Sequence, residues 1–146
     1  MSSITRHMNI ISRCAGLYRT ERLKGSDLGQ NHHRYIFCIC RHPGISQEEL
    51  SRRVYINKSN VTRHLAYLEK NGYVERRQSE EDKRVTLVFP TEKANAALPT
   101  LREIVHDWND MLTEEFTPEE KELFMRLVER AARKAADLIG DEALEE

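Results

Sequence analysis

The stretch from residue 57 to residue 77, NKSNVTRHLAYLEKNGYVERR, gives the clearest indication of the fold. Val61, Leu65 and Leu68 recur at steps of four and three residues, which places them on one face of a helix. The asparagine that opens the stretch is a good N-cap, and Gly72 suits the left-handed turn that ends a helix. The stretch therefore predicts an amphipathic helix with one buried side, followed at once by a strand.

A shorter helix is predicted immediately before this one. Ser46 and Glu49 have the spacing of a capping box, and Ile45 with Leu50 provides the hydrophobic staple around it. A tight connection over residues 54–56 then joins two consecutive helices. This is the arrangement of a helix-turn-helix.

A β-hairpin is predicted after the helix-turn-helix. Residues 73–77 and 84–89 have the composition of strands, and a polar, charged turn separates them. Val85, Leu87 and Phe89 occupy alternate positions, which indicates one apolar face. Because an isolated two-stranded hairpin is only marginally stable, we expect this one to pack on the helices.

Amphipathic helices flank this unit on both sides. The spacing of apolar residues predicts helices over residues 4–23, 31–42 and 91–112, and a last helix capped by Thr117 and Glu120. Their apolar faces are broader than a small hairpin-bearing unit can cover, which favours burial against a second copy of the chain. The expected fold class is mainly α, an α+β winged helix with six helices and a two-stranded β-hairpin wing.

The composition is that of an ordinary globular protein. Of the 146 residues, 39% are hydrophobic and 32% are charged, which suits a single domain over residues 1–146. No apolar run is long enough to span a bilayer, and the N-terminus lacks the apolar core of a signal peptide, so we expect a cytoplasmic protein without membrane contact. The three cysteines form no disulfide framework and are expected to be free thiols.

Charge is segregated along the chain behind a net value of −1. Residues 51–90 carry nine basic and five acidic side chains, whereas residues 91–146 carry seven basic and fifteen acidic ones. A basic middle beside an acidic end indicates a local site for a polyanion, although a solvated charged surface would give the same totals.

Three short motifs together resemble the MarR family of bacterial transcriptional regulators. They are the helix segment Val61-Thr62-Arg63, the helix exit from Leu68 through Gly72-Tyr73-Val74 to Arg76, and the Asp82-Lys83-Arg84 turn. The resemblance runs from about Asn31 to the last helix, with departures at Pro90 and Ala94 near the start of the fifth helix. It implies a repressor, not an enzyme, that binds a near-palindromic operator in double-stranded DNA as a homodimer, without a cofactor.

The same resemblance divides the chain by role. Residues 31–90 would form the winged helix-turn-helix DNA-binding part. Residues 1–25 and 91–140 would supply the dimerisation helices, and a two-fold axis would then present two reading helices to successive major grooves.

The residues expected to contact DNA lie on the reading helix, at the start of the helix before it, and in the wing. Short polar side chains that face away from the buried stripe can hydrogen-bond base edges and phosphates, and the free amides at the start of the preceding helix suit a phosphate. The resemblance implies that Arg84 enters the flanking minor groove with Asp82 holding its guanidinium, whereas an isolated pair of this kind would be read as a surface ion pair. The full set is Ser46, Gln47, Asn57, Lys58, Ser59, Asn60, Thr62, Arg63, His64, Arg76, Asp82, Lys83 and Arg84.

The resemblance also implies release from DNA by a small aromatic or phenolic effector. Such a molecule would bind between the dimerisation helices and the winged helix-turn-helix of residues 31–90, called the reading unit below. By position, the candidate contacts are Arg13, Tyr18, Tyr67 and Trp108.

The cysteines and histidines offer further hypotheses. Cys14 is expected in the core with Ile10 and Leu17, and it is also a candidate redox sensor because some MarR-like proteins sense peroxides through a cysteine near the N-terminus. Cys38 and Cys40 would point about 200° apart on a helix, so they could neither share a metal ion nor pair, and we expect buried thiols. No metal site is expected, because the histidines lack ligand spacing and should face solvent; they are His32, His33, His42 and His106.

Three alternatives to a ligand-responsive repressor remain open. The first is a thiol-based redox-sensing regulator of the same fold. The second is a winged-helix protein-interaction module, against which the outward Lys58, Arg63 and Arg84 argue. The third is a thiol enzyme, against which the absence of a histidine and a charged orienting group at a recognisable spacing from any cysteine argues.

Overall fold

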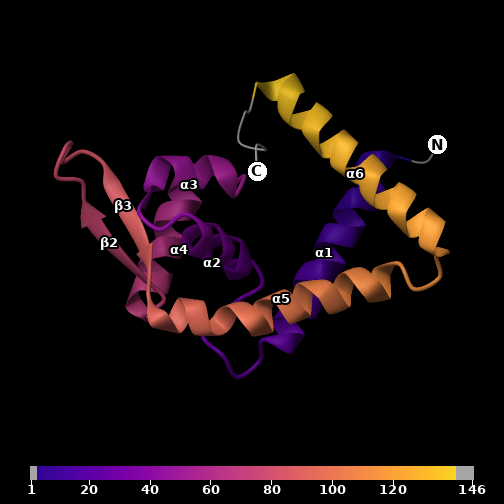
Figure 1. The fold of residues 1–146 in the computed structure, drawn as a ribbon, viewed down its shortest axis with the longest axis horizontal. Coiled ribbons are helices and arrows are strands. Elements are labelled where there is room, and N and C mark those ends of the chain that lie inside the picture. Colours follow the sequence, from indigo (N-terminus) through magenta and orange to yellow (C-terminus); the bar gives the residue numbers. More distant parts are fainter. Residues whose placement is uncertain (1–2, 141–146) are drawn as a thin grey trace.

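The computed structural model describes residues 3–140 and contains, within that range, six helices and three short strands. The reading unit lies on one side of the molecule, and α5 leads from the base of its hairpin to the side where α1 and α6 lie (Figure 1). The expected mainly α winged-helix class is confirmed. The elements are α1 (Ile4–Arg22), α2 (His32–Arg41), β1 (Ile45–Ser46), α3 (Gln47–Arg53), α4 (Lys58–Lys70), β2 (Val74–Gln78), β3 (Thr86–Pro90), α5 (Glu92–Leu112) and α6 (Pro118–Ile139).

The sheet has a third strand that the sequence analysis did not predict. β1 adds to the free edge of β3, so the strand order is β1-β3-β2 with both pairs antiparallel. Ile45 pairs with Val88, and Ser46 pairs with Leu87. A strand of two residues is too short to show alternation, which is why the expected wing had only two strands.

The hairpin buries the opposite face from the one expected. Val88 and Val74 are 0% and 2% exposed and face the helices, whereas Leu87 and Phe89 are only partly buried. On the outer face, the guanidinium of Arg77 lies 4.5 Å from the centre of the Phe89 ring and covers it. Both faces of β3 are apolar, so alternation alone could not decide which one meets the core.

The core forms around α2. Tyr35, Ile36 and Ile39 have no exposed surface, while Cys38 and Cys40 on the same helix are half-buried. The stripe of α4 completes this core and is also fully buried, with additional packing from Leu50 of α3 and from two residues of α5. These stripe and α5 residues are Val61, Leu65, Leu68, Leu101 and Ile104.

Side-chain caps fix where the helices of the reading unit begin. The Asn57 side chain accepts a hydrogen bond from the Asn60 amide at 3.0 Å, as predicted. The Ser46 hydroxyl likewise accepts from the Glu49 amide at 3.1 Å. The predicted capping box at Ser46 is only half formed, because the Glu49 carboxylate binds arginines of its own helix instead. The box at Thr117 is complete and starts α6.

α5 begins at the Thr91 cap despite the departures noted around Pro90. Pro99 lies inside this helix, where it cannot donate the hydrogen bond that would reach back one turn. No helix of the described chain is long and apolar enough to cross a membrane.

Much of the apolar surface of α1 and α6 is uncovered in the isolated chain. Cys14, expected in the core, is exposed, so that prediction is wrong for the single chain, and Ile10 and Leu17 beside it are also exposed. Among the described residues of α6, only Ala136 is buried. The predicted apolar stripe of α6 is therefore largely uncovered within the described chain.

Candidate nucleic-acid interface

The polar face of α4 is presented to solvent. Because its aliphatic stripe is buried, Lys58, Ser59, Thr62 and Arg63 are exposed, and Asn60 is half-buried. The helix-turn-helix thus places most of the predicted reading residues where a duplex can reach them.

Hydrogen bonds already order this face. Gln47 at the start of α3 donates its side-chain amide to the Thr62 hydroxyl at 2.9 Å, and this hydroxyl donates to the Lys58 carbonyl at 3.0 Å. The Arg63 guanidinium donates to the side-chain oxygen of Asn60 at 3.1 Å. Since that partner is neutral, Arg63 keeps its full positive charge available to DNA.

The wing carries the Asp82–Arg84 pair that the resemblance implied. The Asp82 carboxylate accepts from the Arg84 amide at 3.0 Å and from its guanidinium twice at 3.1 Å. These bonds hold the pKa of Asp82 below its ordinary value. The Arg84 side chain is nevertheless 90% exposed. The arginine is therefore both oriented by the turn and accessible.

An open groove lies where α3, α4 and the wing meet. Its volume is about 300 Å³, and its walls combine hydroxyl, amide and charged groups with two valines. Such a groove offers hydrogen-bonding and charged groups to phosphates and base edges of a duplex that lies against the reading helix and the wing. It is lined by Ser46, Gln47, Glu48, Lys58, Val61, Thr62, Arg84, Val85 and Thr86.

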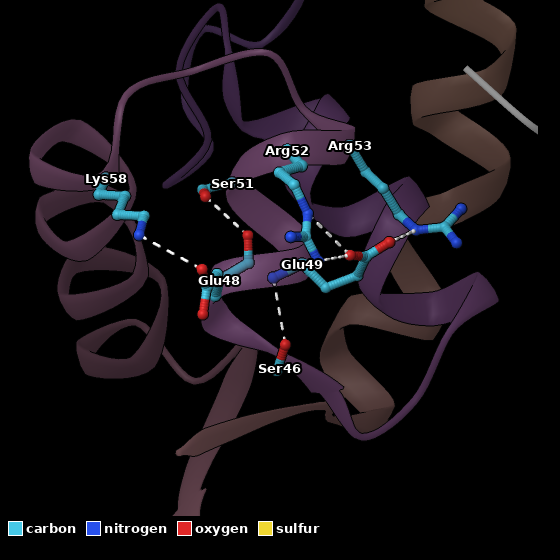
Figure 2. Close-up of polar contacts among 7 residues, drawn as sticks. All are labelled: Ser46, Glu48, Glu49, Ser51, Arg52, Arg53 and Lys58. Atoms are coloured by element: carbon cyan, nitrogen blue, oxygen red, sulfur yellow. Dashed lines mark hydrogen bonds and ion pairs between the residues drawn. The ribbon is translucent and has the colours of Figure 1, made fainter. Parts of the chain in front are cut away.

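Two carboxylates of α3, neither predicted as a site residue, pair with neighbouring cations (Figure 2), and one of them, Glu48, lines the groove. The Glu48 carboxylate lies 3.4 Å from the Lys58 ammonium across the gap between α3 and α4. Glu49 binds Arg52, with Nε 3.0 Å away, and Arg53, with Nε 2.9 Å away. The hydrogen bond from Arg52 is the main cause of the lowered pKa of Glu49.

Two of the predicted DNA contacts, His64 and Arg76, hold parts of the protein together instead of facing freely into solvent. The His64 ring is half-buried, packs against Tyr35 and His32, each with ring centres 5.4 Å apart, and has its pKa lowered by burial. Glu69 at the end of α4 accepts from the Arg76 amide at 3.0 Å and from its guanidinium at 3.1 Å. The geometry thus gives His64 a packing role and Arg76 a role in fixing the hairpin to α4.

The expectation that the histidines face solvent is wrong for His32 and His33, which are buried. The His32 ring accepts from the Gly29 amide at 2.8 Å and stacks on Tyr67 with 5.0 Å between ring centres. Burial is the main cause that lowers the pKa of each of the two imidazoles to about 4. His42 is half-buried and His106 is exposed. No cluster suited to a metal ion occurs among residues 3–140.

Of the four candidate effector contacts, only two are brought together by the fold. Tyr18 of α1 and Trp108 of α5 lie together, with 5.5 Å between ring centres. Tyr67 instead donates to the Asp27 carbonyl at 2.6 Å, beside the start of α2. Arg13 is exposed on α1.

Sequence reasoning missed Arg19, a buried cation on α1. Its Nε donates to the Gln30 carbonyl at 2.7 Å, and within the described chain no carboxylate forms an ion pair with it. Burial, and then the charge of Arg34, lower the pKa of Arg19. Only the turn between α1 and α2 brings these groups together, so no local motif could have indicated them.

Comparison with known proteins gives a consistent result. Residues 28–86 match the family model of the MarR family. The HTH-type transcriptional regulator YybA of Bacillus subtilis is 29% identical over 133 residues, covering 91% of this chain and 89% of the relative. A putative MarR family transcriptional regulator from Listeria monocytogenes, solved in complex with 26mer DNA, superposes with a TM-score of 0.84 at 27% identity, covering 94% of this chain and 91% of that one. A crystal structure of MarR superposes with a TM-score of 0.89 at 27% identity, covering 95% of each chain.

Proposed function

Because the chain belongs to the MarR family of transcriptional regulators, we propose that it binds a near-palindromic operator in double-stranded DNA as a homodimer and represses transcription there. The observation that carries the proposal is the exposed polar face of α4, which adjoins the groove and the Arg84-bearing wing. In this proposal residues 31–90 read the DNA, and residues 1–25 and 91–140 hold the two copies together.

The uncovered apolar surface supports the homodimer. Side chains from both chain ends contribute to it, and removing such area from water stabilises an interface by roughly 25 cal/mol per Å². Two copies joined in this way would carry two reading helices at a fixed separation, as a palindromic site requires. The exposed side chains include Ile4, Leu17, Leu123, Leu127, Leu138 and Ile139.

To test DNA binding, the full chain is used to select duplexes from a random library. The most enriched duplex, called the selected duplex below, is then titrated by fluorescence anisotropy at several salt concentrations. We expect a sequence-preferring complex whose affinity falls as salt rises. Arg84→Ala should weaken it about tenfold or more, whereas the control Lys24→Ala, in an exposed pair with Glu21 outside the interface, should not. A wild-type chain that selects no sequence would refute the proposal.

We further propose that the effector is a small aromatic anion. Arg19 supports this, because a buried guanidinium without a carboxylate partner can bind one supplied by a ligand. Tyr18 on the same helix and Trp108 on α5 offer aromatic surface. Benzoate is a suitable probe: it should release the selected duplex from the wild-type chain and release much less from Arg19→Gln, provided that the variant keeps its melting temperature.

A further inference from the structure

Glu48 has a role that DNA binding alone does not explain. Of the nine residues that line the groove, it alone carries a negative charge. Its side chain is 65% exposed, so packing against the core does not explain why a glutamate stands here. A carboxylate in a groove suited to a polyanion opposes the approach of any phosphate.

The Glu48 carboxylate lies at the groove beside Lys58, which also lines it. The backbone carbonyl of Glu48 accepts from the Ser51 hydroxyl at 2.7 Å, while its side chain crosses to Lys58 at 3.4 Å (Figure 2). Both members of the pair are largely exposed, so the pair contributes little to the stability of the fold. The charge of Glu48 instead affects the binding of a molecule that enters the groove.

Phosphates and base edges of a duplex interact differently with a carboxylate. Phosphates only accept hydrogen bonds and carry the same charge, so they repel it. In the major groove, the amino group of cytosine donates, and glutamate is a known partner for it. DNA that offers Lys58 a phosphate therefore leaves Glu48 without a donor, whereas DNA that places a cytosine amino group beside it satisfies both side chains.

We propose that Glu48 is a specificity-determining residue whose carboxylate, paired with Lys58 in the free protein, disfavours arbitrary duplexes and accepts a hydrogen bond from a cytosine amino group in each operator half-site. The inference rests on the proposed DNA binding. It goes further by assigning a sequence preference to a residue of α3 outside the reading helix.

The test compares the wild-type chain with Glu48→Gln, which removes the charge and keeps the shape. The matched control is Glu75→Gln. Glu75 is 59% exposed, similar to Glu48, pairs with Arg77 on β2 at 2.8 Å, and does not line the groove. Each chain is used for selection from a random library and for titration of the selected duplex and of a scrambled duplex of the same composition.

Glu48→Gln should raise affinity for the scrambled duplex about fivefold at low salt and steepen its log–log salt dependence by up to about 0.9. Affinity for the selected duplex should change by less than about twofold, and the selected consensus should lose one cytosine per half-site. Glu75→Gln should leave the ratio of the two affinities unchanged.

Two results overturn the inference while leaving DNA binding intact. The first is an unchanged affinity ratio and consensus in Glu48→Gln. The second is an equal loss of preference in Glu75→Gln, which would assign the effect to net charge. A wild-type chain that prefers no sequence overturns both this inference and the proposed function.

Discussion

Two buried histidines open α2, and one of them, His32, links α4 to the turn before α2. His32 stacks on Tyr67 of α4 and accepts from Gly29, while His33 lies against Phe37 with its Nδ1 atom lacking a hydrogen-bond partner in the described chain. Both imidazoles are neutral in the folded protein near neutral pH, because burial disfavours their charged form. Protonation therefore favours unfolding.

The free energy of unfolding should consequently fall with acidification. The folded pKa of about 4 lies below the ordinary value of 6.5, so each histidine's contribution is complete above pH 6.5 and is lost progressively as the pH falls toward 4. Between pH 8 and pH 5 the loss should be on the order of 2 kcal/mol for each imidazole. Urea denaturation across this range measures it, above the pH at which most carboxylates titrate.

His33→Leu separates this effect from a general response to acid. The loss of stability between pH 8 and pH 5 should be roughly halved in this variant. Ser59→Ala is the control, because Ser59 is exposed and carries no ionisable side chain, so the variant should keep the wild-type pH dependence. Identical pH profiles for the wild type and His33→Leu would contradict the assignment.

At the scale of elements, α4 depends on the side chain that begins it. Asn57→Ala removes the acceptor for the Asn60 amide and should lower the free energy of unfolding by about 1 kcal/mol. Ser59→Ala, two residues along on the same exposed face, should change it by less than about 0.5 kcal/mol. Chemical denaturation of both variants measures the difference, and equal effects would show that the cap contributes nothing.

The hairpin is fixed to α4 by Glu69. Glu69→Ala removes the acceptor of both the Arg76 amide and its guanidinium. Hydrogen exchange should become faster in β2 and β3 than in α2, with less than about 1 kcal/mol lost globally because the pair is partly exposed. Glu75→Ala, at an exposed ion pair of the same strand, should leave that exchange unchanged.

Local signals predicted the helices well, and long-range contacts explain what they missed. The asparagine and threonine caps and the stripe of α4 depend on residues within one or two turns, so the sequence displays them directly. The burial of His32 depends on Tyr67, and the setting of Arg19 depends on the turn at Gln30. The buried face of β3 was decided by its docking on the helices, because both of its faces are apolar.

At the scale of the whole molecule, the exposed apolar surface of α6 favours the proposed dimer. Leu127 is 48% exposed in the isolated chain, so Leu127→Glu should leave the subunit folded while disrupting the proposed dimer. Light scattering after size-exclusion chromatography should give the mass of two chains for the wild type and of one chain for the variant.

The same variant should lose most of its affinity for the selected duplex, because one subunit can engage only one half-site. Glu129→Ala is the matched control, since Glu129 pairs with Arg133 on the exposed side of α6. A wild-type chain that is monomeric at micromolar concentration would contradict the homodimer.

Pro99 gives α5 a mechanical property that a regular helix lacks. Because Pro99 cannot donate a backbone hydrogen bond, α5 can bend most easily here. The bend would separate the part of the helix next to the wing from the part that carries Trp108. With a rise of about 1.5 Å per residue, a bend of about 10° there would displace the Leu112 end by roughly 3 Å relative to the winged lobe. In the proposed dimer, a bend of a few degrees at Pro99 would therefore change the separation of the two reading helices, which would no longer match the pitch of the duplex.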